Sequence, residues 1–320
     1  MPDTLDRPVV READATTGFR LAAFGAVLVV VLFAGYGIGR LSHSTSTADA
    51  KPAAAMPGIP VDESQPHQHQ TDGTVAQPAD APMRMGAAVG GLSLSSSGLT
   101  LAPAATTFTA GRPQSLKFRI TNASGAAITT FALVHDKLLH LIVIRRDLTG
   151  FQHLHPTMAP DGTWSVDLTL AEPGSYRAIA DFTAIVGGSP VATSLGADLT
   201  VAGSYQPVPL PAPAQQATSD GFGVTYEGAP RIESTQPLLM TVTGPDGRPA
   251  ALEPYLGAYG HLVVLRAGDV GYLHVHPEPD LADGKVKFWL AAPSPGNYRM
   301  FFDFQVAGQV HTAAWSLIIR

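Results

Sequence analysis

Histidines at short, regular spacing are the residues of this chain best suited to chemistry. His153 and His155 form one His-x-His pair, and His274 and His276 form another. In a β-strand, residues i and i+2 point to the same face with their α-carbons about 6.5–7 Å apart, so both imidazoles of a pair can reach one ion. Imidazole nitrogens are ligands for copper and zinc. The pattern therefore predicts a bound copper or zinc ion.

The two pairs belong to a tandem duplication. Residues 140–156 read HLIVIRRDLTGFQHLHP, and residues 261–277 read HLVVLRAGDVGYLHVHP with the same spacing. Residues 161–182 and 283–304 also match in length and share their DG, PG-x-YR and DF positions. Self-similarity at a fixed period indicates two copies of one structural unit, called repeat 1 and repeat 2 below.

A third histidine, His140 or His261, begins the matched stretch of each repeat. If DLTG makes a hairpin turn, Ile144 pairs with His153 across it, and His140 lies on the same face as the His-x-His pair. A slip of one residue would move His140 to the other face. The sequence thus predicts a three-histidine site in each repeat.

Other residues could complete the two sites. His135 precedes the triad of repeat 1, whereas His311 occurs only in repeat 2, so the two sites need not be equivalent. Asp181 and Asp303 could accept a hydrogen bond from the second ring nitrogen of a ligand. They could equally pair with the arginines four residues before them.

The alternative is that the histidines are purely structural. Backbone groups or tyrosine hydroxyls can satisfy a histidine in a β-sandwich, and a duplicated copy shares residues by descent. Many residues differ between the copies, however, while the three histidines and the proline after each pair are retained. This selective retention favours metal binding. We assign four aromatic residues to core packing instead: Trp164, Tyr176, Trp289 and Tyr298.

Short strand-like segments separated by turn sequences must position these histidines. The stretch HLIVI is apolar on both faces, which is typical of an interior strand. Together with many Gly and Pro and few charged residues, these segments predict an all-β fold of two tandem antiparallel β-sandwiches of immunoglobulin or cupredoxin type. We place repeat 1 at residues 87–203, a Pro-rich linker at 204–218 and repeat 2 at 219–320.

The N-terminal part has a different composition. Residues 21–39 are uncharged and apolar and match the length needed to cross a bilayer, so they predict one N-terminal transmembrane helix. Arginines before this span favour a cytoplasmic N-terminus at residues 1–20. Residues 40–86 read as a disordered tether. We therefore expect a single-pass plasma membrane protein whose repeats are extracytoplasmic.

Composition excludes several classes of function. The net charge is −6 and no basic stripe with interleaved aromatics occurs, which argues against nucleic-acid binding. The chain has no cysteine, so disulfides, thiolate metal sites and a blue-copper electron-transfer centre are excluded.

Residues 140–144, 151–156 and 173–177, with their counterparts in repeat 2, resemble the YtkA-like and FixH-like β-sandwich domains of the bacterial envelope. The resemblance covers roughly residues 90–320. It implies extracytoplasmic handling of copper or another heavy metal. The tandem arrangement and the missing cysteine favour storage or delivery over redox shuttling.

Three functions remain open at this point. The leading one is non-enzymatic sequestration of copper or zinc and its delivery to a metal transporter or another envelope protein. The second is an envelope interaction or structural module with structural histidines. The third is a cupin-like metal enzyme, because Gly268 to His276 followed by Asp280 resembles the first cupin motif. Asp147 replaces the glycine of that motif in repeat 1, and no second cupin motif is found.

Overall fold

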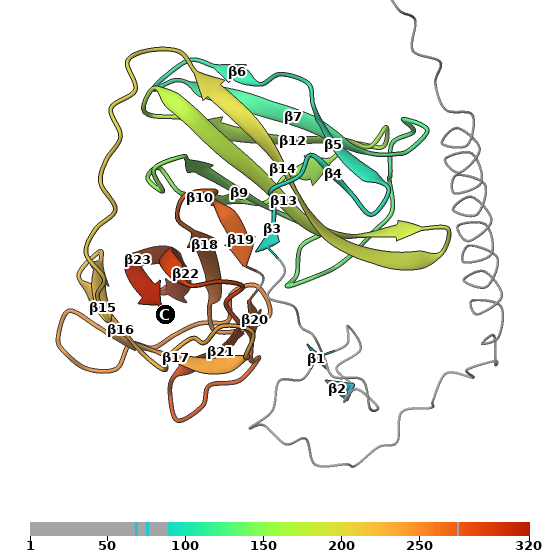
Figure 1. The fold of residues 1–320 in the computed structure, drawn as a ribbon. Coiled ribbons are helices and arrows are strands. Elements are labelled where there is room, and N and C mark those ends of the chain that lie inside the picture. The colour runs from blue at the N-terminus through green and yellow to red at the C-terminus, as the bar shows by residue number, and fades with distance from the viewer. Residues whose placement is uncertain (1–67, 70–74, 77–88, 274) are drawn as a thin grey trace, which may run out of the picture. The chain divides into compact units, whose positions relative to one another are not determined.

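The computed structural model describes residues 68–69, 75–76, 89–273 and 275–320 (Figure 1). All regular structure in these ranges is β-strand, apart from turns and bends. Strands β1 (Gln68–His69) and β2 (Val75–Ala76) form a short antiparallel pair. The predicted span at 21–39 and most of the tether lie outside the described residues. Within those residues, no helix has the length and apolar character to cross a membrane.

Repeat 1 is a sandwich of two sheets. One sheet has the order β10–β9–β13–β14–β6, with β8 also paired to β13, and the other has the order β11–β12–β7–β5–β4. All pairs are antiparallel except β6 with β14. The strands are β4 (Ser95–Ser96), β5 (Leu99–Pro103), β6 (Thr107–Phe108), β7 (Pro113–Asn122), β8 (Phe131–Ala132), β9 (Leu139–Arg145), β10 (Gln152–Leu154), β11 (Thr157–Met158), β12 (Thr163–Thr169), β13 (Gly174–Val186) and β14 (Ser189–Val201).

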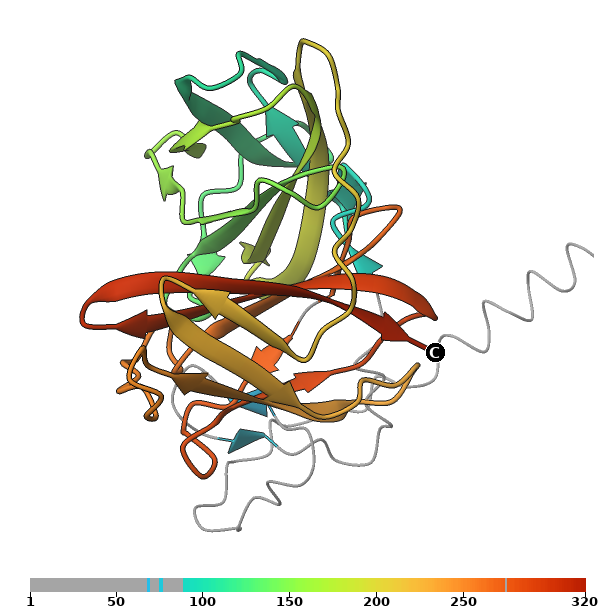
Figure 2. The ribbon, with the colours of Figure 1, turned by 90° about the vertical axis from the view of Figure 1, so that its left-hand side faces the viewer.

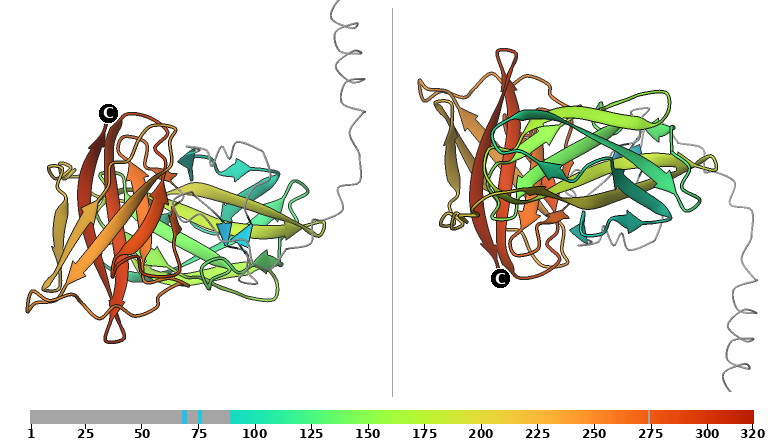
Figure 3. Two further views of the ribbon diagram at one scale, coloured as in Figure 1. Left: turned by 90° about the horizontal axis from the view of Figure 1, so that it is seen from below. Right: turned by 90° about the horizontal axis from the view of Figure 1, so that it is seen from above.

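Repeat 2 has the same organisation. One sheet has the order β15–β16–β17–β21–β20, and the other has the order β23–β22–β18–β19–β3. Its longest hairpin, β22–β23, is drawn in red in Figure 2. This hairpin corresponds to β13–β14 of repeat 1, which is drawn in yellow-green to yellow in Figure 3. The strands are β3 (Val89–Gly90), β15 (Gln216–Ser219), β16 (Phe222–Glu227), β17 (Gln236–Thr243), β18 (His261–Arg266), β19 (Gly271–Leu273), β20 (His276–Pro277), β21 (Val286–Leu290), β22 (Gly296–Val306) and β23 (Gln309–Ile319).

The predicted all-β chain with two tandem β-sandwiches is confirmed for the described residues. The repeats match in detail as well as in outline. Val143 pairs with Gln152 between β9 and β10, and Val264, 121 residues further on, pairs with Leu273 between β18 and β19. The duplicated sequence therefore folds with the same strand register in both copies.

Each sandwich has its own apolar core between its two sheets. The four aromatic residues assigned to core packing are buried, as predicted: Trp164, Tyr176, Trp289 and Tyr298. The hydroxyls of Tyr176 and Tyr298 each donate a hydrogen bond of 2.8 Å to a backbone carbonyl four residues upstream, at Glu172 and Ser294. A buried hydroxyl needs such a partner because desolvation without one is costly.

A third apolar cluster joins the two repeats. Strand β9 is central in its sheet, as predicted, and its two faces have different partners. Leu141 and Val143 face the core of repeat 1, whereas Ile142 and Ile144 pack against residues of repeat 2. The cluster, called the inter-repeat cluster below, consists of Ile142, Ile144, Leu148, Ile179, Val263, Leu265, Val270, Tyr272 and Phe301.

The first described residues of repeat 1 also cross between the repeats. Val89 and Gly90 form β3, which pairs with β19 of repeat 2. The next residue, Gly91, binds repeat 1, where its carbonyl accepts a hydrogen bond of 2.9 Å from Nε of Arg177. A side chain at Gly196 would place its Cβ only 1.8 Å from that carbonyl, so the close approach requires glycine. One sheet of repeat 2 is therefore completed by residues from the start of repeat 1.

A buried ion pair fixes the linker to repeat 1. Arg145 and Asp147 are 2.9 Å apart, and their side chains are 4% and 5% exposed. The guanidinium of Arg145 also donates to the carbonyl of Gln206, and Asp147 accepts a hydrogen bond of 2.9 Å from the backbone N–H of Val208. The Pro-rich linker is thus held by specific polar contacts near its start.

Candidate metal centre

The alternation of side chains along β9 and β18 decides where the first histidine of each repeat points. His140 lies on the same face of β9 as Ile142 and Ile144, since residues two apart share a face. His261 is related in the same way to Val263 and Leu265 of β18. All four of these apolar residues belong to the inter-repeat cluster. Both histidines therefore project toward the other repeat.

The register between β9 and β10 differs from the predicted one. His153 pairs with Ile142, whereas the sequence predicted Ile144. The turn lies one residue earlier than expected, because Asp147 accepts hydrogen bonds from the backbone and hydroxyl of Thr149 and so fixes a turn around itself. The pairing shifts by two residues, and an even shift preserves the face. His140 and His153 therefore lie together, as predicted.

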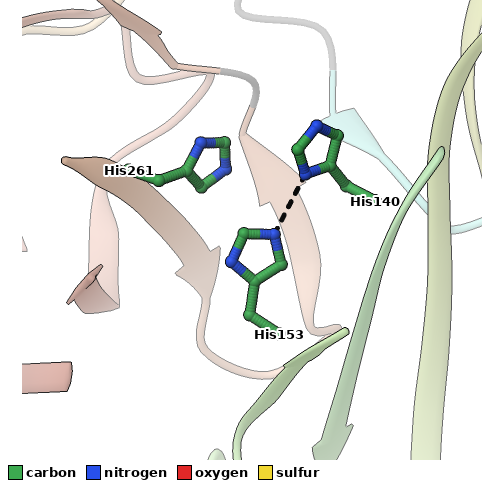
Figure 4. Close-up of side chains that lie close together, drawn as sticks. All are labelled: His140, His153 and His261. Atoms are coloured by element: carbon green, nitrogen blue, oxygen red, sulfur yellow. Dashed lines mark hydrogen bonds between the residues drawn. The ribbon is translucent and has the colours of Figure 1, made fainter. Parts of the chain in front are cut away.

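His140, His153 and His261 form one close group. One ring nitrogen from each lies within 4.8 Å of the others, and the three imidazoles face a common space (Figure 4). The rings of His140 and His261, which are equivalent residues of the two repeats, stack at 5.2 Å between centroids. The sequence predicted a separate site in each repeat. His261 of repeat 2 lies with His140 and His153 of repeat 1, because the faces that carry them pack together.

Hydrogen bonds orient two of these rings. Nε2 of His140 lies 3.0 Å from the carbonyl oxygen of Val134, which can only accept, so this nitrogen carries a proton. Nδ1 of His140 lies 3.1 Å from Nε2 of His153, and Nδ1 of His153 lies 2.8 Å from Oδ2 of Asp303. The carboxylate of Asp303 accepts from Nδ1 of His153, and Nε2 of His153 faces His140. The outer nitrogen of each ring is thus fixed, and the inner nitrogens face each other.

Asp303 belongs to repeat 2 and contacts a histidine of repeat 1, a partner that the sequence did not reveal. Its other oxygen accepts a hydrogen bond of 2.6 Å from Thr312. Its counterpart Asp181 accepts hydrogen bonds from Ser194 and, across the repeats, from the hydroxyl of Tyr272 at 3.2 Å. Arg177 and Arg299, the alternative partners, bind elsewhere, at Asp198 and Ser316. Each aspartate thus bridges the two repeats.

His155 lies beside the group. Its ring is 4.8 Å from that of His153 and 5.1 Å from that of His140. Its Nε2 is buried and has no hydrogen-bond partner among the residues that the structure describes. Burial, followed by the nearby charges of His153, His140 and Lys137, lowers the pKa of His155 to about 3. His155 is therefore a neutral imidazole with a buried nitrogen at neutral pH.

His135 reaches the group from a tight turn. Val134 and Lys137 are joined by two backbone hydrogen bonds, and His135 and Asp136 between them have positive φ angles of 48° and 60°. These angles are those of a type I′ turn. The turn places the ring of His135 5.9 Å from that of His140 and 5.5 Å from that of His261. The equivalent position in repeat 2 is Leu256, also at positive φ, so only repeat 1 supplies this histidine.

The remaining predicted residues fall outside this group. His311 is buried beside Phe222 and Phe304, and its Nδ1 lies 2.8 Å from Asp220. His274 lies outside the described residues, and the side chain of His276 is likewise not described.

The backbone carbonyl of Val134 and the repeat-crossing role of Asp303 are the features that sequence reasoning missed. Tyr255 is the counterpart of Val134, and burial, together with the charge of Asp303, raises its pKa to about 12. The equal spacing of the repeats identifies this equivalence, but nothing in the sequence shows that residue 303 contacts residue 153.

The donor set of the group fits a transition metal. It offers three imidazole nitrogens, with two more imidazoles adjacent, and no thiolate. Such nitrogen ligands suit copper(II) and zinc. The Asp303–His153 contact has the form of the carboxylate–histidine–metal arrangement seen around bound zinc.

One sequence family accounts for both repeats. A family model described as a domain of unknown function (DUF8832) matches residues 95–195 and again residues 217–319. The chain belongs to this family. Each DUF8832 match starts at or next to the first residue of a strand, β4 or β15, and the second ends with β23. No curated protein matches the chain.

Several solved structures are distantly similar. The Escherichia coli adhesin FdeC is 20% identical with a TM-score of 0.24, and the match covers 71% of this chain and 66% of that one. Invasin, a bacterial integrin-binding protein, is 13% identical with a TM-score of 0.23 and coverages of 71% and 41%. The Yersinia pseudotuberculosis adhesin InvE has the same identity and TM-score, with coverages of 70% and 60%. The chain spans less than two thirds of each of these proteins.

Proposed function

We propose that this protein binds a copper or zinc ion at His140, His153 and His261, and that its role is to hold and deliver that ion. The observation that carries the proposal is the approach of three ring nitrogens to within 4.8 Å in a buried setting, with two rings oriented from outside. Structural histidines need one partner each. This group gathers imidazoles from two repeats around one space.

The residues around the group prepare its nitrogens for binding. The carbonyl of Val134 holds the proton of His140 on Nε2, which leaves the lone pair of Nδ1 directed at the group. Asp303 accepts from Nδ1 of His153, so Nε2 is the nitrogen left to bind an ion. His155 and His135 are the candidates for a fourth ligand, because their rings lie next to the three.

We further propose that each sandwich is of the immunoglobulin type. One feature common to both repeats supports this class. Tyr176 and Tyr298 each bond to the backbone a few residues upstream, as in the tyrosine corner of immunoglobulin-like domains.

The cellular setting that we propose is the outer face of the plasma membrane. It is supported by the apolar stretch at 21–39, by the polar composition of 40–86 and by the resemblance to YtkA-like and FixH-like domains. A tethered metal-binding protein could pass its ion to a transporter or another envelope protein.

Metal titration of the full-length chain tests the proposal. We expect the chain to bind copper(II) or zinc near one ion per molecule in isothermal titration calorimetry. The His140→Ala, His153→Ala and His261→Ala variants should bind at least about tenfold more weakly, which corresponds to about 1.4 kcal/mol. His311→Ala is the matched control, since His311 is also buried and paired with a carboxylate but lies outside the group. Equal binding by all four variants and the unaltered chain would contradict the assignment.

The two other functions make different predictions. An envelope interaction module with structural histidines would show no saturable metal binding, and the three variants would lose only stability. A cupin-like enzyme would show metal-dependent turnover that is lost in Asp280→Ala. We propose a non-enzymatic role.

A further inference from the structure

We infer that the bound ion controls the docking of the two repeats, so that the site acts as a metal-dependent joint. This inference rests on the proposed function and adds a form of regulation to the same site. His140 and His153 come from repeat 1, and His261 comes from repeat 2. An ion held by all three is bonded to both repeats at once.

Side-chain hydrogen bonds accompany the ligand group across the interface, beside the backbone pairing of β3 with β19. Asp303 of repeat 2 bonds to His153, Tyr272 of repeat 2 bonds to Asp181, and Arg146 donates to the carbonyl of Asp269 at 3.0 Å. The first of these contacts involves a ligand directly. Asp303 is therefore a positioning residue that holds a ligand of the opposite repeat in place.

The apolar part of the interface lies next to the ligands on the same strands. Ile142 follows His140 by two residues, and Val263 follows His261 by two. Phe151, two residues before His153, stacks on Phe301 with ring centroids 4.0 Å apart. Because these contacts and the ligands share one face of each sheet, any separation of the repeats moves His261 away from the other two ligands.

Thermodynamic linkage then acts in both directions. A ligand that binds only the docked arrangement stabilises it, and docking raises the affinity for the ligand by the same factor. Such couplings typically amount to about 5- to 150-fold in an equilibrium constant. An empty site leaves docking to the apolar cluster, the side-chain hydrogen bonds named above and the pairing of β3 with β19.

The joint can be tested by cutting the linker of the folded full-length chain. Residues 211–212 are exposed and follow the linker contacts with Arg145 and Asp147, so a protease recognition sequence inserted there can be cleaved after folding. The association of the two resulting parts is then measured by analytical ultracentrifugation, in zinc and in EDTA. We expect the parts to associate at least about fivefold more tightly in zinc. His261→Ala should abolish the difference, and His311→Ala should retain it.

The outcomes separate the joint from the metal site itself. If the uncut chain binds zinc but the cut parts associate equally in zinc and EDTA, the joint is wrong and the metal site stands. If the uncut chain binds no zinc or copper, the proposed function fails and the joint fails with it. If zinc tightens association equally in the chain and in His261→Ala, the ion acts elsewhere and the joint is overturned.

A second test measures how docking of the repeats affects zinc affinity, and it uses two neighbouring residues of β9. Ile144 faces the inter-repeat cluster, whereas Val143, beside it on β9, faces the core of repeat 1. Neither is a ligand. Ile144→Ala should weaken zinc binding by the uncut chain several-fold through loss of docking, and Val143→Ala should leave affinity unchanged while lowering stability. Equal affinities of both folded variants and the unaltered chain would contradict the joint.

Discussion

Asp303 in repeat 2 lies 2.8 Å from Nδ1 of His153 in repeat 1, and both side chains are only 3% exposed. These two residues are 150 positions apart in the sequence. The contact exists because equivalent faces of the two repeats pack together. It fixes which nitrogen of His153 is available to a ligand.

Asp303→Asn should reduce metal affinity without removing a ligand. Loss of such an outer partner typically costs about 10- to 100-fold in affinity, because the imidazole is less well oriented and less basic. Competition with a chromogenic chelator would measure the change. Asp220→Asn, which alters the partner of His311, should leave affinity unchanged. Equal affinity in Asp303→Asn would show that the contact does not support metal binding.

Asp147→Asn should destabilise repeat 1 in a pH-dependent way. Burial tends to raise the pKa of Asp147, but hydrogen bonds from Val208 and Thr149 and the charge of Arg145 together lower it below its ordinary value of 3.8. Since the folded-state pKa is the lower one, the carboxylate stabilises the fold above pH ~4, and this contribution is lost as pH falls through the folded pKa. Breaking a buried pair typically costs about 3–5 kcal/mol.

Urea unfolding at pH 7 and pH 3 would check this expectation. The difference in unfolding free energy between the chain and Asp147→Asn should be large at pH 7 and smaller at pH 3. Asp246→Asn, in an exposed pair with Arg248, should change stability little at either pH. A constant difference at both pH values would refute the assignment of the carboxylate.

Metal should raise the stability of the chain, and a chelator should reverse the effect. At a free ion concentration of 100 times Kd, binding to the folded state alone adds about 2.7 kcal/mol to the free energy of unfolding. The gain should shrink as pH falls, because imidazoles must lose a proton to bind. Calorimetric unfolding scans with zinc and with EDTA measure it. His153→Ala should show no gain, and a gain as large as that of the unaltered chain would point to another site.

Tyr272→Phe should destabilise the contact between the repeats. Burial and the charge of Asp181 raise the pKa of Tyr272 well above 10, so its hydroxyl remains a donor to that carboxylate. Removing the donor leaves Asp181 with one partner fewer, at a cost of about 1–3 kcal/mol. Tyr226→Phe, in the core of repeat 2, is a matched control. Equal unfolding free energies for the two variants would contradict this role of Tyr272.

The sequence predicted the local features of the candidate site because they depend on strand periodicity. Equal spacing in the two halves of the sequence indicated the duplication. The alternation of side chains along HLIVI and FQHLH predicted that His140 and His153 lie on one face. The exact pairing was wrong by two residues, since Asp147 shapes the turn through its side chain. Because a shift of two residues keeps each side chain on the same face, His140 and His153 still lie on one face.

The composite nature of the group could not be predicted from one repeat. The apolar outer face of HLIVI was explained as that of an interior strand, although it also packs against repeat 2. Which surfaces of two domains meet depends on long-range packing, and nothing in local spacing reports it. His261 was therefore assigned to a second site. The sequence offered one signal of this packing. The segments HLIVI and HLVVL both have apolar outer faces, and these faces pack together in the structure.

The stacking of His140 on His261 has a consequence for the origin of the chain. When equivalent residues touch across an interface, the contact has the self-complementary form of a twofold homodimer. A single ancestral repeat could have met a second copy of itself in this way. Fusing the two genes would have freed each half to diverge, so that the turn carrying His135 in one half carries Leu256 in the other. The unequal surroundings of the histidines would then be a product of fusion, unattainable in a symmetric dimer.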